Sequence, residues 1–194
     1  MTAIEEPELK YVRIFLLPGG LAPIRQTDGA IGYDVAARVV VCPFEMDKQQ
    51  PHLRKMLFNF KDPPDDPSLK CLVRLDTDPI SYVLHPGDKV LIGIGFITEL
   101  TFPWFYWVAP RSGLATKNFI QVTNAPGTID SDYRGEAAAC LHNYGKEDFY
   151  IHQGMRIAQI IFQKASTPEF NFVTDYNELT TTIRGSGGFG STGV

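Results

Sequence analysis

Short apolar segments, separated by turns that contain glycine and proline, recur along most of the chain. In several of them apolar and polar residues alternate, as at 156–163, where Ile157 and Arg156 belong to opposite faces. Alternation with a period of two is typical of β-strands that bury one face. The pattern predicts strands at 11–17, 35–41, 72–75, 82–84, 89–100, 104–109, 120–122, 136–143, 148–151, 156–163 and 170–173.

Few segments show a helical period. Residues 112–118 are long enough for one or two helical turns, and residues 46–59 are the best candidate for a longer helix. Many short strands with little helix predict an all-β sandwich or jelly roll.

Two segments depart from this pattern. Residues 43–79 are rich in Pro, Asp and Lys and read as an insertion within a single domain that covers 1–194. This segment is too long for an ordinary loop, so it is either a surface elaboration or a surface that binds a partner. Residues 184–194 form a glycine-rich C-terminal arm with one aromatic residue, Phe189. Such an arm is either a frayed terminus or a lid that closes over a ligand.

Composition narrows the function classes. The chain has 194 residues, with 44% hydrophobic and 12% aromatic residues, which suits a folded domain. A net charge of −4 argues against a general nucleic-acid-binding protein. Cys42, Cys71 and Cys140 have neither zinc nor disulfide spacing and fit a reducing compartment. We recognise no signal peptide, because residues 1–10 carry three glutamates, and no membrane span, because the longest apolar run, 102–110, is too short. We expect a cytoplasmic protein.

The segment 127–136 is the richest candidate for chemistry. Glycines near both ends enclose Asp130, Asp132 and Tyr133, which is typical of a turn between two strands. One interpretation is a plain hairpin with solvated acids. The other is that one carboxylate acts as a general base, while the backbone reads a flat heterocycle and Tyr133 stacks on a sugar or base.

Four further segments carry alternatives of the same kind. Arg111 ends an apolar strand and Ser112 is a suitable N-cap, so 109–115 is either a capped turn or an anion site. Asp34 either caps a turn or holds a metal-bound water. Gln159 is an edge residue or a ligand contact. In the arm, Arg184 can reach a phosphate and Phe189 can cover a base.

In this order, the five segments resemble the five motifs of the trimeric dUTP pyrophosphatases (dUTPases). The matches are Gly-Tyr-Asp at 32–34, Pro-Arg-Ser-Gly-Leu-Ala at 110–115, Asn124 with 127–136, Gly154 with Arg-Ile-Ala-Gln at 156–159, and 184–193. The second, third and fifth are specific, and the other two are loose. The resemblance runs from Tyr11 to Val194 except for the insertion, and Ile31 stands where the family usually has a small residue.

The resemblance implies a jelly-roll-like homotrimer with shared sites that converts dUTP and water into dUMP and pyrophosphate, limiting uracil in DNA and supplying dUMP. Asp130 would deprotonate the attacking water. Mg²⁺ would bridge the phosphates and meet Asp34 through water. In the hairpin that starts at Gly127, the backbone of Thr128, Ile129 and Ala138, together with Asn124, would contact the uracil, and Tyr133 would contact the deoxyribose. The phosphates would be bound by Arg111, Ser112, Gly113, Gln159 and Arg184. Phe189 would cover the base.

Two alternatives remain. A dCTP deaminase has the same fold but would need a catalytic Glu in the strand after the third motif, and 136–142 has no acid beyond Glu136. A non-catalytic nucleotide-binding or regulatory protein would use the insertion as its partner surface. The presence of Asp130 and of the glycine-rich arm favours the pyrophosphatase over both.

Overall fold

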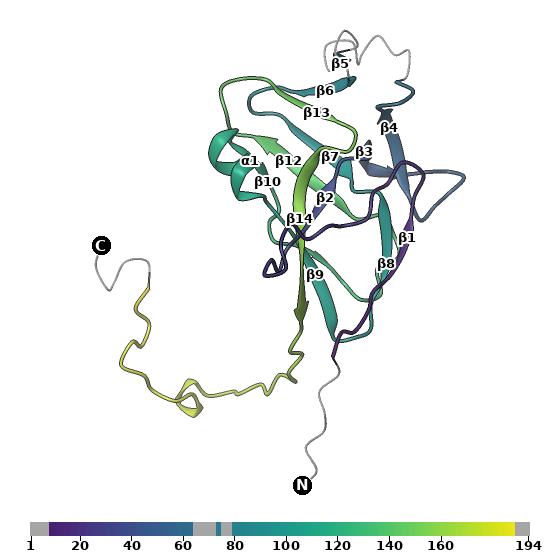
Figure 1. The fold of residues 1–194 in the computed structure, drawn as a ribbon. Coiled ribbons are helices and arrows are strands. Elements are labelled where there is room, and N and C mark those ends of the chain that lie inside the picture. The colour runs from purple at the N-terminus through teal and green to yellow at the C-terminus, as the bar shows by residue number, and fades with distance from the viewer. Residues whose placement is uncertain (1–7, 64–72, 75–78, 189–194) are drawn as a thin grey trace.

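The computed structural model describes residues 8–63, 73–74 and 79–188 of the chain. Its β-strands pack into one body, with a single short helix on one side and an extended C-terminal segment leaving it (Figure 1). The elements are β1 (Arg13–Leu16), β2 (Tyr33–Ala36), β3 (Val39–Met46), β4 (Arg54–Asn59), β5 (Val73–Arg74), β6 (Ser81–Leu84), β7 (Lys89–Gly93), β8 (Phe96–Glu99), β9 (Trp104–Ala109), α1 (Ser112–Lys117), β10 (Ile120–Val122), β11 (Gly127–Ile129), β12 (Ala138–Asn143), β13 (Phe149–His152), β14 (Arg156–Lys164) and the 3₁₀ turn η2 (Tyr176–Glu178).

Two larger sheets organise the body. One has the strand order β10-β12-β7-β3-β4, and the other has the order β11-β9-β14-β2. Two small sheets, β1-β8 and β13-β6-β5, complete it. The inward faces meet in a core whose largest fully buried side chains are Tyr106, Phe58, Phe96, Leu84 and Ile92. The expected all-β fold with one short helix is therefore confirmed.

Two of the expected long strands are interrupted. The segment 89–100 divides into β7 and β8 around Gly95, whose φ is +88°. The backbone of Gly20 lies against this break, and a Cβ on Gly20 would come within 2.0 Å of the Gly95 carbonyl oxygen. The segment 35–41 likewise divides, because β2 joins one sheet and β3 joins the other. A run of apolar residues does not reveal such a change of sheet.

The helix expected at 46–59 is wrong. This segment holds the end of β3, a turn and β4, which pairs with β3 through Val39 and Asn59 and through Val40 and Phe58. Phe58 is 1% exposed and belongs to the main core. Tertiary burial of Phe58 therefore decides the conformation over the local helical pattern. The segment 43–79 thus contains part of the main sheet.

The strand expected at 170–173 is also wrong. These residues are exposed and lie in the segment after β14 that runs away from the body (Figure 1). A strand needs a neighbour for its backbone groups, and 170–173 pairs with no described strand. At 72–75, β5 covers Val73–Arg74, while Leu72 and Leu75 lie outside the described residues.

Candidate active site

One sheet carries four of the five motif segments. In β11-β9-β14-β2, Gln159 of β14 pairs with Asp34 of β2 on one side and with Ala109 of β9 on the other. Arg111 follows two residues after Ala109, so it emerges beside this row. The first, second and fourth motifs therefore meet at one end of the sheet because of strand register.

Asp34 is the centre of an ion-pair cluster at this end. Its Oδ1 accepts a hydrogen bond from Arg111 Nε at 3.0 Å, and its Oδ2 accepts one from Arg156 Nη1 at 3.0 Å. The Asp34 side chain is 11% exposed, whereas Arg156 is half exposed. One carboxylate between two guanidinium groups leaves a net positive charge, which suits an anionic ligand.

Arg111 is held by two acceptors. Besides the bond to Asp34, its Nη1 donates to the Arg156 backbone carbonyl at 3.0 Å. These contacts use two of the five N–H donors of a guanidinium group. The group is therefore fixed in orientation and keeps donors for a ligand.

Gln159 is fixed against the second motif. Its Nε2 donates to the Pro110 carbonyl oxygen at 2.9 Å. A Cβ on Gly32 would lie 2.1 Å from the Gln159 Oε1. Gly32 is therefore required by the close approach of Gln159, which links the first motif to the fourth.

The short helix begins differently from the expectation. The N-cap is Arg111, with extended backbone and no capping bond from its side chain, so the expectation that Ser112 is the N-cap is wrong. Ser112 is already the first helical residue, and its carbonyl accepts from Thr116 Oγ1 at 2.8 Å. Ser112 and Gly113 are exposed, and a Cβ on Gly113 would meet no described atom within 4 Å. This surface is open to a ligand.

The third motif forms a turn between β11 and β12, but the expected hairpin is wrong, because these two strands belong to different sheets and do not pair with each other. β11 pairs with β9, and Asp130 follows its last residue with an exposed side chain. The half-buried Tyr133 donates from its hydroxyl to the Glu136 carbonyl oxygen at 3.2 Å. Burial raises the pKa of the Tyr133 phenol, against the opposing charge of Arg54, so the hydroxyl stays protonated at neutral pH.

The other residues expected to contact the uracil are Asn124, Thr128, Ile129 and Ala138. Asn124 lies against Gly127, since a Cβ on Gly127 would be 3.0 Å from the Asn124 Nδ2. Thr128 is exposed and Ile129 half-buried, while Ala138 opens β12, opposite Gly93. Thr128 and Asp130 border a surface cavity of about 550 Å³, together with Trp104, Phe105 and Trp107 of β9.

Within one chain, Asp130 lies far from the Asp34 cluster. Ile129 pairs with Tyr106, which puts Asp130 level with Phe105, whereas Asp34 is level with Ala109. The two aspartates are thus separated by four residues along the strands and three strands across the sheet. This corresponds to about 13 Å along the strands and about 14 Å across them. A single chain does not bring the third motif to the other three.

Residues 79–193 match the family model of dUTPase, which covers the second to fifth motifs. The chain belongs to the dUTPase family. Deoxyuridine 5'-triphosphate nucleotidohydrolases from Rhizobium rhizogenes and Rickettsia canadensis are 46% and 49% identical to it over 117 and 123 residues. These alignments cover 60% and 63% of this chain and 73% and 80% of the relatives. The chain is accordingly a dUTP diphosphatase.

Solved structures of phage dUTPases share the fold. The dUTPase of Staphylococcus bacteriophage 80alpha with dUpNHpp matches 95% of this chain and 99% of its own, with a TM-score of 0.67 and 19% identity. The dUTPase of phage phi11 of S. aureus, whose structure displays a species-specific insert, matches 87% and 99%, with a TM-score of 0.60 and 15% identity. A mutant phi11 dUTPase whose structure describes coordination of a structural Mg(II) ion matches with a TM-score of 0.59, 16% identity and coverage of 86% and 98%.

Glu136 of this dUTPase is committed to a structural contact. It is 4% exposed, and its carboxylate accepts from Arg38 Nε at 2.7 Å and from the Gly95 amide at 2.9 Å. This buried carboxylate therefore holds β12 and the Gly95 break to Arg38 and does not face the candidate active site. Sequence reasoning missed the partner Arg38, and it gave no role to Arg156. The sequence did contain a signal for Arg156, because this cationic residue belongs to the fourth motif and lies three residues before Gln159.

The C-terminal arm of the dUTPase makes local contacts. Arg184 Nε donates to the Gly187 carbonyl at 2.8 Å, and residues 166–186 are exposed. The segment leaves the body beyond β14 (Figure 1). The bond of Arg184 is therefore local to the arm, and Phe189 lies outside the described residues.

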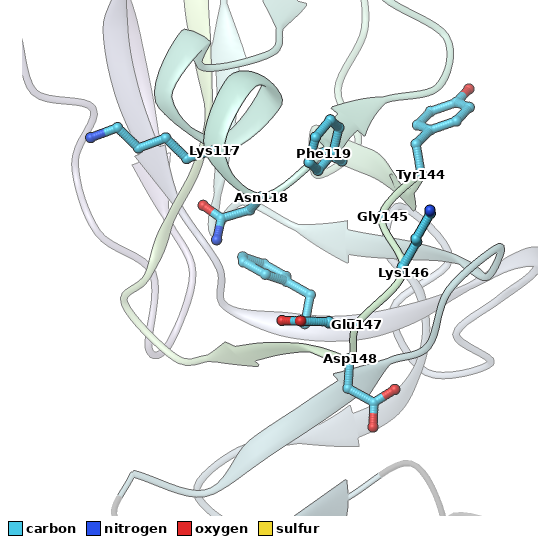
Figure 2. Close-up of a pocket in the computed structure, with 9 residues that line it drawn as sticks. Lys117, Asn118, Phe119, Tyr144, Gly145, Lys146, Glu147 and Asp148 are labelled. Atoms are coloured by element: carbon cyan, nitrogen blue, oxygen red, sulfur yellow. The ribbon is translucent and has the colours of Figure 1, made fainter.

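A second cavity lies at the far end of α1. Its volume is about 540 Å³, and it is lined by Lys117, Asn118, Phe119, Phe149 and the turn 144–148. Figure 2 shows Asn118 and Glu147 near its centre, with Lys117 directed away. None of the motif residues expected at the substrate lines it, so it is separate from the candidate active site.

Metal ligands are sparse in the described part of the dUTPase. Residues 8–63, 73–74 and 79–188 contain no group of three or more His, Cys, Asp or Glu side chains arranged to hold a metal ion. The same residues form no helix long and apolar enough to cross a membrane.

Proposed function

We propose that this dUTPase cleaves dUTP between the α- and β-phosphates, with Asp130 as the general base. The observation that carries the proposal is the exposed carboxylate of Asp130 at the end of β11, beside a cavity, in the motif that the family model covers. Asp130 would accept a proton from water as that water attacks the α-phosphate. Pyrophosphate then leaves, and dUMP is released with the water oxygen on its phosphate.

The turn of the third motif would select the base. The backbone N–H and C=O groups of Thr128, Ile129 and Ala138, with the Asn124 amide, would pair with the edge of uracil. Tyr133 would lie under the deoxyribose, where its ring leaves no space for a 2′-hydroxyl. A base that leaves these polar groups unpaired is strongly disfavoured, because buried unsatisfied groups cost free energy.

The cluster around Asp34 would bind the triphosphate. Arg111 has a fixed orientation with donors left for a ligand, and Ser112 and Gly113 offer an open backbone surface beside it. Gln159 would keep this loop in place through its bond to Pro110, and Arg184 would add a further cation when the arm closes. Phe189 would cover the uracil.

Magnesium fits this donor set only through water. Asp34 is the one carboxylate in the described cluster, and each of its oxygens already accepts from an arginine. A carboxylate oxygen has a second lone pair, so Asp34 can also accept from a metal-bound water. Mg²⁺ characteristically keeps several waters and binds substrate phosphates. When bound, it would neutralise phosphate charge and orient the leaving group.

A homotrimer with shared sites would bring the motifs together. The separation of Asp130 from Asp34 within one chain supports an arrangement in which the third motif of one subunit faces the second and fourth motifs of another. The exposed apolar residues of the segment between β14 and the arm, among them Phe170, Phe172 and Ile183, favour docking of this segment on other subunits.

Incubation with single nucleotides tests the proposal. The protein with Mg²⁺ should release pyrophosphate from dUTP, and far more slowly from UTP, dTTP and dCTP. Ammonia from dCTP would instead identify a deaminase, and binding without turnover would identify a nucleotide-binding protein. Comparable turnover of UTP would remove Tyr133 from its role at the sugar.

A further inference from the structure

Arg156 has no assigned task in the proposed reaction, yet it completes the Asp34 cluster. Asp34 accepts from Arg111 on one oxygen and from Arg156 on the other, at 3.0 Å each. The backbone carbonyl of Arg156 also accepts from Arg111. Arg156 therefore contacts both partners of the phosphate-side cluster, once through its side chain and once through its backbone.

The charge balance of the cluster depends on this second arginine. With Arg156, one carboxylate and two guanidinium groups sum to one positive charge. Without it, Asp34 would cancel Arg111, and the cluster would offer an anion no net attraction. Asp34 has a side chain that is only 11% exposed, so solvent screens it less than it screens a surface carboxylate.

A local irregularity places Arg156 where it can do this. The pairing of β14 with β2 shifts between Arg156 and Ala158, which marks a β-bulge at the start of the strand. A bulge redirects a side chain relative to a regular ladder. Arg156 lies opposite Ala36, two residues beyond Asp34, and nevertheless reaches the Asp34 carboxylate.

We propose that Arg156 is a positioning residue that compensates the charge of Asp34, so that Arg111 stays both oriented and net attractive to the triphosphate. This inference rests on the proposed function of the same site. In this arrangement Arg156 acts on the nucleotide through Asp34 and Arg111. Its contribution is largely lost when Asp34 carries no charge, because the half-exposed Arg156 is then no longer held in the cluster and solvent screens it.

A double-mutant cycle on nucleotide binding tests the inference. The affinity of dUpNHpp would be measured by calorimetry without Mg²⁺, for the wild type, Arg156→Gln, Asp34→Asn and the double variant. Arg156→Gln should weaken binding roughly tenfold or more, because the favourable charge is lost. In the Asp34→Asn background the same substitution should cost less than about threefold. An equal cost in both backgrounds, or no cost in either, overturns the proposal.

Two further variants separate positioning from folding. Arg156→Lys keeps the charge and should recover most of the affinity that Arg156→Gln loses, whereas equal weakening by both would show that charge is not the cause. Arg13→Gln is the matched control, because Arg13 forms an exposed ion pair with Glu99 in another sheet, and binding should be unchanged. Absence of dUTP turnover and of dUpNHpp binding in the wild type would instead refute the proposed function itself.

Discussion

At the residue scale, the site separates into groups that are fixed and groups that are open. Asp34, Arg111 and Gln159 are held by hydrogen bonds between 2.9 and 3.0 Å. Asp130 and Gly113 are exposed. Fixed groups are already ordered, so the binding of an anion does not lose side-chain entropy there. Exposed groups are accessible to a ligand or to another subunit.

Replacement of Asp130 by Asn keeps the size of the side chain and removes the proposed base. We expect kcat for dUTP to fall by ~10²-fold or more, with the binding of dUpNHpp largely kept. Asp132→Asn is the matched control, because Asp132 is also exposed and lies two residues away. Near-normal turnover by Asp130→Asn, with a loss in Asp132→Asn, would transfer the role of base to Asp132.

Gly113→Ala should separate stability from binding. An added Cβ meets no described atom within 4 Å, and alanine favours a helix by about 0.5–1 kcal/mol over glycine. The thermal midpoint should therefore be equal or higher. The KM for dUTP should rise, because the methyl group would occupy the surface proposed for the phosphates. An unchanged KM would show that the nucleotide does not approach Gly113.

The buried phenol of Tyr106 makes the stability of the fold depend on pH in the alkaline range. Burial raises the pKa of its phenol from 10.0 to about 12, although a hydrogen bond with Thr98 lowers it in part. A raised folded-state pKa stabilises the protein below pH 10, and this contribution is lost as the pH rises from 10 to 12. Chemical denaturation across this range should show the decline, and Tyr106→Phe should reduce its slope. Equal slopes would assign the decline to other groups.

At the element scale, the β3–β4 hairpin joins a core contribution to an exposed tip. Phe58 of β4 packs edge-on against Phe60, with ring centroids 5.0 Å apart, within the main core. The tip folds on itself, since Asp47 Oδ1 accepts from the amides of Gln49 and Gln50. The base of this hairpin therefore stabilises the domain, while the tip depends on the body far less.

Two variants of the hairpin should differ in stability. Phe58→Ala should lower the free energy of unfolding by about 3–5 kcal/mol, because it leaves a cavity in the core. Replacing residues 48–52 with a short glycine-containing turn should change it by less than about 1 kcal/mol. Denaturant titration measures both. A large loss on shortening the tip would show that the tip contacts another subunit.

At the scale of the whole molecule, strand register determines which motifs one chain can combine. The row of Asp34, Gln159 and Ala109 gathers three motifs, while β11 presents Asp130 at the other end of β9. The segment after β14 runs away from the body (Figure 1), and Arg184 in it bonds locally to Gly187. A complete site therefore calls for more than one chain, as the proposed trimer provides.

Complementation between two inactive variants tests shared sites. Asp130→Asn and a variant that lacks residues 185–194 would be unfolded, mixed in equal amounts and refolded. A site is complete when its third motif comes from a truncated chain and its arm from an Asp130→Asn chain. Random assembly makes this about one half times one half, so roughly a quarter of wild-type activity should return. No recovery in trimers shown to be hybrid would refute sharing.

The sequence by itself determined most strands, because the alternation of apolar and polar residues is a local property, and it supplied the motif residues on which the proposed site rests. The motifs predicted Arg111, Gln159 and Asp34 as one group, and the structure places their side chains around one row. The sequence placed the arm at 184–194, whereas the exposed segment that follows β14 already begins at residue 166, and Phe189 lies outside the described residues.

Tertiary structure decided the features that depend on partners distant in the chain. The burial of Phe58 made residues 54–59 a strand where local periodicity favoured a helix. Glu136 became structural through Arg38, which lies 98 residues away. Arg156 reached Asp34 only because a bulge in β14 lies beside β2. Local sequence does not encode such pairings, since register, burial and charge compensation are set only when separate strands pack together.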